Sequence, residues 1–252
     1  MKNIVVLAPH PDDEILTCYS IIKKAAATDR VWIVIVTNGD RRGREMASIR
    51  VAESFTALSK LGTRPNQIIV MGYGDTGMSQ NNSFLYRLYH LKGSDILPSL
   101  VSNQTYHPIL GSKEWHYKMQ GKHGDYSRSG FLHDLERIFL HCKPGEVYVS
   151  SRYDLHGDHI ALYHFTMEVI KKMKTPPLVM QYIVHGDDRG HWPTNASYFE
   201  CPPVCDEEIW GKRVITKVDA AEKKALIEIF QSQLTQSDHL LNFAKNEEVF
   251  IN

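Results

Sequence analysis

Short apolar runs alternate with segments of helical periodicity along most of the chain. The runs are rich in β-branched residues, which is typical of strands buried on both faces of a parallel sheet. They predict five strands, at residues 3–8, 31–37, 68–71, 146–150 and 178–184. Segments whose apolar residues recur every three or four positions predict helices at 12–27, 44–62, 130–142, 160–173 and 218–234. Gly62 would cap the second helix, and Pro144-Gly145 would form a turn before the fourth strand.

Strands that alternate with helices at this spacing imply right-handed βαβ crossovers. We therefore predict an α/β fold, in which a Rossmann-like, mostly parallel sheet is flanked by helices in a single domain over residues 1–252. The regular pattern fails at residues 72–128, where Gly, Ser, Asn, His and aromatic residues mix without a repeat. So long a stretch in a compact domain is usually functional, and we expect a substrate-binding insertion after the third strand.

Two clusters of ionisable residues directly follow predicted strands. The first is His10-Pro11-Asp12-Asp13-Glu14, and the second is Tyr153-Asp154-Leu155-His156-Gly157-Asp158-His159. In an open parallel sheet, ligands bind beyond the carboxyl ends of the strands, so we expect both clusters to lie at that edge. Crowded charges of this kind are usually relieved by a bound cation or by a task in proton transfer. Imidazole and carboxylate groups are also the ligands from which hydrolytic zinc sites are built.

The overall charge narrows the choice of ligands. Lys plus Arg and Asp plus Glu both count 29, so the formal net charge is zero. This balance argues against broad electrostatic binding to nucleic acid or to an anionic membrane, and it favours a small, specific ligand. No apolar run reaches transmembrane length and no signal peptide is visible, so we expect a cytoplasmic protein. The oligomeric state stays open, and a homo-oligomer is compatible with the sequence.

Four cysteines are too few for a disulfide scaffold in a chain of this length. Cys18 and Cys142 fall in helical patterns and are expected to be small buried residues. Cys201 and Cys205 flank Pro202-Pro203-Val204, and they are read as two loop thiols, with a metal clip as the less favoured alternative.

The two charged clusters resemble the motifs of a known family. The segment 10–14 matches the first motif of the zinc-dependent N-acetylglucosaminyl deacetylases of the PIG-L or LmbE-like family, and the segment 156–159 is similar to the second, usually written His-Pro-Asp-His. Gly157 replaces the proline, which removes no ligand. Further segments resemble the family more weakly: Arg50 with Glu53, residues 72–78, and Gln231-Ser232-Gln233.

The resemblance implies roles for the clustered residues. His10, Asp13 and His159 would bind one zinc ion, or another divalent metal, and Asp12 would act as the general base toward zinc-bound water. His156 would face the developing oxyanion or protonate the leaving amine, with Asp158 fixing its orientation. The implied reaction is hydrolysis of the N-acetyl group of an N-acetylated amino sugar or glycoside, for example inside a nucleotide sugar, which releases acetate and the free amine.

Residues outside the two motifs are harder to assign. Arg50 and Asp75 resemble positions that hold sugar hydroxyls, with a surface salt bridge as the alternative. His185 at the end of the fifth strand is expected to contact the substrate or a metal ligand. Glu14 is expected to be structural. Asp40, Arg41 and Arg42 lie at a strand end and could touch the substrate, but a solvated loop is the favoured reading. Six residues of the insertion could either wall the substrate pocket or pack the insertion itself: Tyr106, His107, Trp115, His116, Tyr117 and His123.

Two other functions remain open on the sequence. A zinc amidohydrolase could act on a lipid-linked or peptidyl N-acyl amine through the same residues. A non-catalytic α/β module that binds a sugar or nucleotide is less favoured, because neither a GxGxxG nor a GxxxxGK[ST] segment is present.

Overall fold

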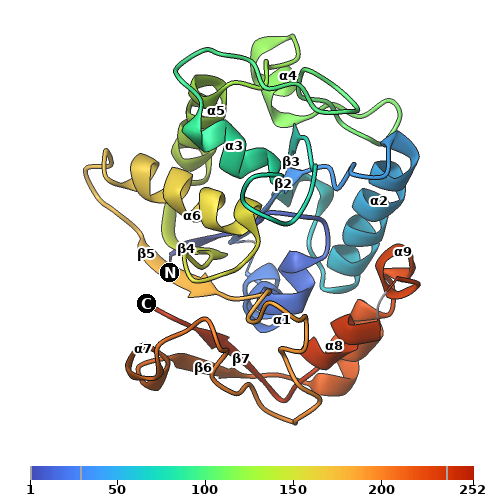
Figure 1. Ribbon diagram of the computed structural model, residues 1–252, viewed down its shortest axis with the longest axis vertical. Helices are drawn as coiled ribbons and strands as arrows, with labels where there is room; N and C mark the ends of the chain where they lie inside the picture. The colour runs from blue at the N-terminus through green and yellow to red at the C-terminus, as the bar shows by residue number, and fades with distance from the viewer. Residues whose placement is uncertain (1, 29, 237) are drawn as a thin grey trace.

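The centre of the molecule is a sheet of five parallel strands in the order β3-β2-β1-β4-β5 (Figure 1). This computed structural model describes residues 2–28, 30–236 and 238–252. The strands are β1 Asn3–Ala8, β2 Val31–Thr37, β3 Ile68–Tyr73, β4 Pro144–Ser150 and β5 Leu178–Tyr182. The predicted α/β fold with a mostly parallel sheet is confirmed, and each strand begins within two residues of its predicted start.

Helices cover both faces of the sheet, which explains why its strands are apolar on both sides. Along β1, Val6 faces one core, whereas Val5 and Leu7 face the other. The first core is closed by α1 Asp13–Ala26, α2 Arg44–Lys60 and α8 Ala220–Ile227. The second is closed by α3 Phe84–His90, α5 Arg128–Cys142 and α6 Gly157–Ile170. No helix in the described part of the chain is long and apolar enough to cross a membrane.

The strand order places β1 beside β4. The chain builds β2 and β3 on one side of β1 and then returns to build β4 and β5 on the other side. Val6 of β1 pairs with Tyr148 of β4, so the loops that follow these two strands leave the sheet next to each other. Such a switch point is where ligands bind in folds of this type.

The insertion after β3 is more regular than predicted. It contains α3 and α4 Trp115–Gln120, so the prediction of an irregular insertion over 72–128 is wrong for these residues. Each helix has fewer than two full turns, which is too short for a helical repeat to stand out in the sequence. The insertion is fastened to the sheet by Tyr106, whose amide donates a hydrogen bond to the carbonyl of Gly72 and whose hydroxyl donates one to Asp40 at 2.8 Å.

The C-terminal third departs most from the expected pattern. The predicted helix 218–234 is two helices, α8 and α9 Gln231–Leu234, because the backbone leaves the helical conformation at Phe230. A short antiparallel pair was not predicted, and it consists of β6 Val214–Lys217 and β7 Glu247–Phe250. The remaining short elements are α7 Glu207–Gly211 and the 3-10 helices at Pro65–Gln67 and Asp238–Phe243. Pro144 and Gly145 do not form the predicted turn but are the first two residues of β4, and proline is tolerated at the first position of a strand. The chain turns one residue earlier, at Lys143, whose φ is 47°.

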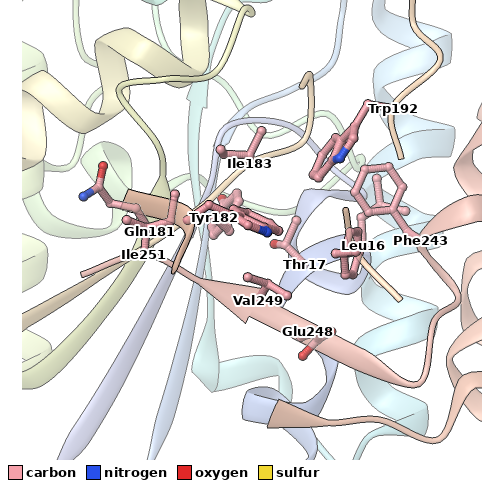
Figure 2. Close-up of a pocket in the computed structure, with 12 residues that line it drawn as sticks. Leu16, Thr17, Gln181, Tyr182, Ile183, Trp192, Phe243, Glu248, Val249 and Ile251 are labelled. Atoms are coloured by element: carbon pink, nitrogen blue, oxygen red, sulfur yellow. The ribbon is translucent and has the colours of Figure 1, made fainter. Parts of the chain in front are cut away.

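A small cavity lies inside the first core, between α1, β5 and β7 (Figure 2). Its volume is about 20 Å³, and aromatic residues such as Trp192 and Phe243 line it together with Thr17 and Glu248. A volume of this size holds about one water molecule. The cavity is therefore a feature of core packing and too small for an organic ligand.

The attachment of the insertion can be tested at Gly72. Gly72 and Gly62 both have a positive φ, 82° and 83°, but a Cβ on Gly72 would collide with the backbone carbonyl of Tyr106, whereas one on Gly62 would meet nothing within 4 Å. We expect Gly62→Ala to lower the free energy of unfolding by about 1 kcal/mol, and Gly72→Ala to lower it by about 2 kcal/mol more. Urea unfolding measures both changes, and equal losses would show that the contact with Tyr106 is not tight.

Candidate active site

The loops that follow β1 and β4 bring the predicted site residues together at one edge of the sheet. All nine lie in or directly behind one pocket. Those that line it are His10, Asp12, Asp13, Arg50, Asp75, His156 and His185. Asp158 and His159 lie behind them and are fully buried. The expected convergence of the two clusters is thus present in the structure.

Three potential ligand atoms form a small triangle. His10 Nδ1 and Asp13 Oδ2 are 3.3 Å apart, Asp13 Oδ2 and His159 Nε2 are 3.3 Å apart, and the two ring nitrogens are separated by 3.2 Å. A second trio, in which His156 takes the place of Asp13, keeps its ligand atoms within 4.8 Å of one another. These residues could hold a metal ion.

Two carboxylates hold the histidine rings in place from behind. Asp158 Oδ2 lies 3.1 Å from His10 Nε2, and Asp154 Oδ2 lies 3.2 Å from His159 Nδ1. A carboxylate at one ring nitrogen keeps the proton there and directs the lone pair of the other nitrogen forward, as in many metal sites. The two forward nitrogens, His10 Nδ1 and His159 Nε2, are the ones that meet at Asp13.

The electrostatics of the triangle favour positive charge at its centre. Despite burial, hydrogen bonds to Asp13 and Asp158 raise the pKa of His10 well above its usual value. Despite burial, Asp154 and Asp13 raise the pKa of His159 to about 9, and the two histidines lower the pKa of Asp13 well below its usual value. The negative charge of the carboxylates behind the rings is therefore balanced by positive charge at the triangle, which either protons on the histidines or a bound cation can supply.

Asp12 lies beside the triangle in a strained conformation. It precedes α1 with φ 125°, a region that side-chain-bearing residues rarely adopt and that is often found at functional sites. The Arg50 guanidinium donates a hydrogen bond to its carboxylate at 3.0 Å and another to the carbonyl of Pro11 at 2.9 Å. Burial raises the pKa of Asp12 to about 6, although Arg50 opposes this shift. Asp12 is therefore a fixed, mostly ionised carboxylate at neutral pH.

Glu14 has the structural role that was expected. Its Oε2 accepts a hydrogen bond from the amide of Asp12 at 3.0 Å, so it fastens the turn that holds Asp12. Burial raises the pKa of Glu14 to about 7.

His156 begins α6 and uses its ring to cap that helix. Its Nδ1 accepts a hydrogen bond from the amide of Asp158 at 3.1 Å, so a neutral ring carries its proton on Nε2. Burial, together with the neighbouring imidazoles, lowers the pKa of His156 well below its usual value. The expected contact between the Asp158 carboxylate and His156 is not among the contacts of the described residues. That carboxylate contacts His10 and accepts a hydrogen bond from the amide of Leu85 instead.

Arg50, Asp75 and His185 line the pocket around this centre. Arg50 lies between Asp12 and Asp75, and its Nη1 is 3.7 Å from the Asp75 carboxylate. Both residues are buried, so their pairing is not the surface salt bridge considered above. The ring of His185 lies 5.2 Å from that of His156 and 5.0 Å from that of His159, measured between centroids. Burial lowers the pKa of His185 to about 4.

The pocket itself is open and has a volume of about 400 Å³. Beyond the central residues, Gly77 and Met78 of the insertion line it, as do Arg41, Arg42 and Gln233. The six insertion aromatics that were considered as pocket walls are not among its lining residues. Tyr106 and Trp115 are instead buried in the packing of the insertion.

Two other predictions concern residues at the margins of the site. Asp40 is fully buried, so the reading of a solvated loop is wrong for it; Arg41 and Arg42 are exposed as expected. The Sγ of Cys201 lies 3.5 Å from the carbonyl oxygen of Cys205, and neither thiol belongs to a group of potential metal ligands in the described residues.

Comparison with protein families identifies the chain. The family model PIG-L, described as GlcNAc-PI de-N-acetylase, matches residues 5–170. The chain belongs to the PIG-L family. The matched region contains both charged clusters, Arg50, Asp75 and the insertion. A comparison with curated proteins found no match.

Solved structures with the same fold include deacetylases. The zinc-inhibited form of the teicoplanin deacetylase Orf2 is 15% identical to this PIG-L chain, with a TM-score of 0.56, and the likeness covers 99% of this chain and 97% of the other. The N,N'-diacetylchitobiose deacetylase from Pyrococcus horikoshii is 14% identical, with a TM-score of 0.54 and coverage of 99% and 82%.

The same fold also carries a different reaction. The 4-carboxy-2-hydroxymuconate hydratase from Pseudomonas putida is 14% identical to the chain, with a TM-score of 0.52 and coverage of 97% of this chain and 83% of the other. At such identities the likeness shows the fold alone. The activity of this PIG-L member must therefore be argued from its own site.

One important residue of that site, Asp154, was not assigned a role from the sequence. In addition to holding His159, it accepts hydrogen bonds from the amides of His156, Val184 and His185. It thereby joins the loop after β4 to the end of β5. Its position two residues before His156 in a charged strand-end loop was a signal, but the partner of its carboxylate is decided by tertiary contacts.

Proposed function

We propose that this protein is a zinc-dependent hydrolase that removes the acetyl group from an N-acetylated amino sugar or glycoside. The observation that carries the proposal is the triangle of His10 Nδ1, Asp13 Oδ2 and His159 Nε2, with sides of 3.2–3.3 Å, at the floor of an open pocket beside Asp12. Membership in the PIG-L family and the deacetylases among the similar structures support the same reaction.

The triangle fits a tetrahedral zinc site. Zinc bonds to nitrogen and oxygen of about 2.0–2.1 Å require neighbouring ligand atoms that are about 3.3 Å apart, close to the separations observed here. His10, Asp13 and His159 would then hold the ion, with Asp158 and Asp154 as the carboxylates behind the two rings. When bound, zinc would supply the Lewis acidity that polarises an amide carbonyl and activates water near neutral pH.

Asp12 is suited to accept the proton of the attacking water. Its carboxylate lines the pocket and is held by Arg50, and its pKa of about 6 leaves most of it ionised at pH 7. A base whose pKa lies just below the working pH combines the correct protonation state with a useful basicity. Removal of that proton would make the water nucleophilic enough to attack the acetamide carbon.

His156 is suited to act on the other side of the reaction. Because its Nδ1 accepts a backbone hydrogen bond, its Nε2 carries the proton of a neutral ring in the pocket that it lines. This N–H could donate a hydrogen bond that stabilises negative charge on the carbonyl oxygen. The leaving amine would take up the proton that Asp12 had accepted from the water, since a neutral imidazole does not give up its N–H proton. Arg50, Asp75 and His185 would hold the hydroxyl groups of the sugar around the acetamide.

Acetate release and metal content together test the proposed function. Purified protein should contain about one divalent metal ion per chain, which plasma emission spectroscopy measures, and it should release acetate from at least one member of a panel of N-acetylated amino sugars and their glycosides. Turnover of N-acyl peptides or lipid-linked amines without turnover of any sugar would instead favour the broader amidohydrolase. Protein without bound metal and without any hydrolase activity would contradict both enzymes.

Substitutions should separate the base from the metal ligands. Asp12→Asn should keep the metal but lower kcat by about 10²–10⁴-fold, because it removes only the group that accepts the proton. His159→Ala should lose the metal as well, because it removes a ligand. Metal content and kcat are measured on the same preparations. A near-normal rate in Asp12→Asn would show that another group is the base.

The role of Asp154 can be tested through metal affinity. Asp154→Asn leaves all three proposed ligands in place but weakens the hold on His159, and we expect about 10–100-fold weaker zinc binding in a competition with a chromophoric chelator. Asp40→Asn is the matched control, because Asp40 is also a buried carboxylate at a strand end but bonds to Tyr106 and to the amide of Asp75. Equal zinc affinities for both variants would contradict the role given to Asp154.

A further inference from the structure

A second hollow continues outward from the catalytic pocket. This outer groove has a volume of about 720 Å³ and shares Arg41, Gly77 and Met78 with the pocket. Its far wall is built by the insertion, from α3 with Arg87 and from residues 98–100. A substrate whose acetamide lies at the triangle would therefore extend its remaining part along this groove.

The charged residues along this path are distributed unevenly. Asp12, Asp13 and Asp75 line the inner pocket, whereas no carboxylate of the described part of the chain lines the outer groove. The charged side chains that line the outer groove are Arg41 and Arg87, and Arg42 stands at the rim of the inner pocket. Since the whole chain carries equal numbers of acidic and basic residues, this is a local concentration of positive charge.

The arginines of the groove are also free to bind a ligand. Both Arg41 and Arg87 are exposed, and in the described residues neither guanidinium forms an ion pair or a hydrogen bond with the protein. Arg50, by contrast, is buried and paired with Asp12 and Asp75. The buried arginine thus pairs with the carboxylates of the site, whereas the groove arginines have no partner of opposite charge among the residues that the structure describes.

We propose that the substrate carries an anionic group, a phosphate or a carboxylate, on the part remote from its acetamide, and that Arg41 and Arg87 bind this group in the outer groove. The proposal rests on the proposed function for the acetamide end. A guanidinium presents a planar fork of donors that matches the oxygens of phosphate and carboxylate, and such charge-assisted bonds are stronger than neutral ones. The insertion would then serve to supply one wall and one arginine of the anion site.

Matched substrates test this inference. The neutral probe is the phenyl glycoside of N-acetylglucosamine, and the anionic probes are the same glycoside with a phosphate or with a carboxylate at the para position of the phenyl ring, remote from the acetamide. We expect kcat/KM for acetate release to be about tenfold or more higher for at least one anionic probe than for the neutral one. Which anionic probe is preferred identifies the group. Added salt should reduce the preference, because the arginines are exposed.

Arginine variants locate the effect. In the double variant Arg41→Gln with Arg87→Gln, KM for the preferred anionic probe should rise until the preference is lost, while kcat stays within about twofold, because neither side chain touches the reacting amide. Arg137→Gln is the matched control, since Arg137 is an exposed arginine of α5 that lines neither hollow. Circular dichroism confirms that the variants fold.

The outcomes distinguish this inference from the proposed function. Equal kcat/KM for neutral and anionic probes, or an equal loss on both in the double variant, would overturn the anion site while leaving the deacetylase in place. If no probe releases acetate, the deacetylase proposal fails on these sugars, and calorimetry with the phosphate-bearing phenyl glycoside decides the anion site separately. Binding that weakens about fivefold or more in the double variant supports the site, and unchanged or absent binding overturns it.

Discussion

The meeting of His10, Asp13 and His159 at one point is the constraint on which the rest of the site depends. Two of these residues follow β1 and the third lies in the first turn of α6 after β4, so they can meet only if β1 and β4 are neighbours. The rings are then oriented by Asp158 and Asp154, and Asp154 is itself fastened by amides at the end of β5. The geometry of three atoms thus draws on three adjacent strands, and a shift of any one of them would open the triangle. A parallel sheet, whose strands all end at one edge, is well suited to this purpose.

Holding this many ionisable groups away from water is costly, and the structure offsets the cost locally. Asp13 and Glu14 lie in the first turn of α1, where the helix dipole favours negative charge. Glu14 holds the amide of Asp12, and Arg50 holds its carboxylate, so both ends of the strained residue are satisfied. What remains is an excess of carboxylate around the two histidines, which only positive charge at the centre can balance. The stability of the site and its capacity to hold a cation therefore have the same electrostatic origin.

The sequence predicted the parts of this arrangement that follow from local pattern. Strands buried on both faces leave continuous apolar runs in the sequence, so all five strands of the sheet could be predicted. The two clusters of ionisable residues could be recognised because each directly follows a strand. Contacts between side chains that only the tertiary structure brings together could not be predicted in this way. The resemblance implied that Asp158 orients His156, its neighbour in the second motif, yet its carboxylate contacts His10, which follows a different strand. The burial of Lys223 in α8 was hidden for a similar reason: its ammonium pairs at 2.8 Å with Glu248, from a strand that was not predicted.

The proposed metal site and the outer groove are built from different segments of the chain, which explains how one fold can serve different reactions and substrates. The ligand triangle and Asp12 come from the turns after β1 and β4, which the sheet holds rigidly. The outer groove comes instead from the loop after β2 and from the insertion after β3, which are joined to each other through Asp40 and Tyr106. Loops of this kind can change in length and charge without moving the strands that position the centre. In this chain they bring Arg41 and Arg87 to the same groove, so the residues that would choose the substrate are separate from those that would break its amide bond.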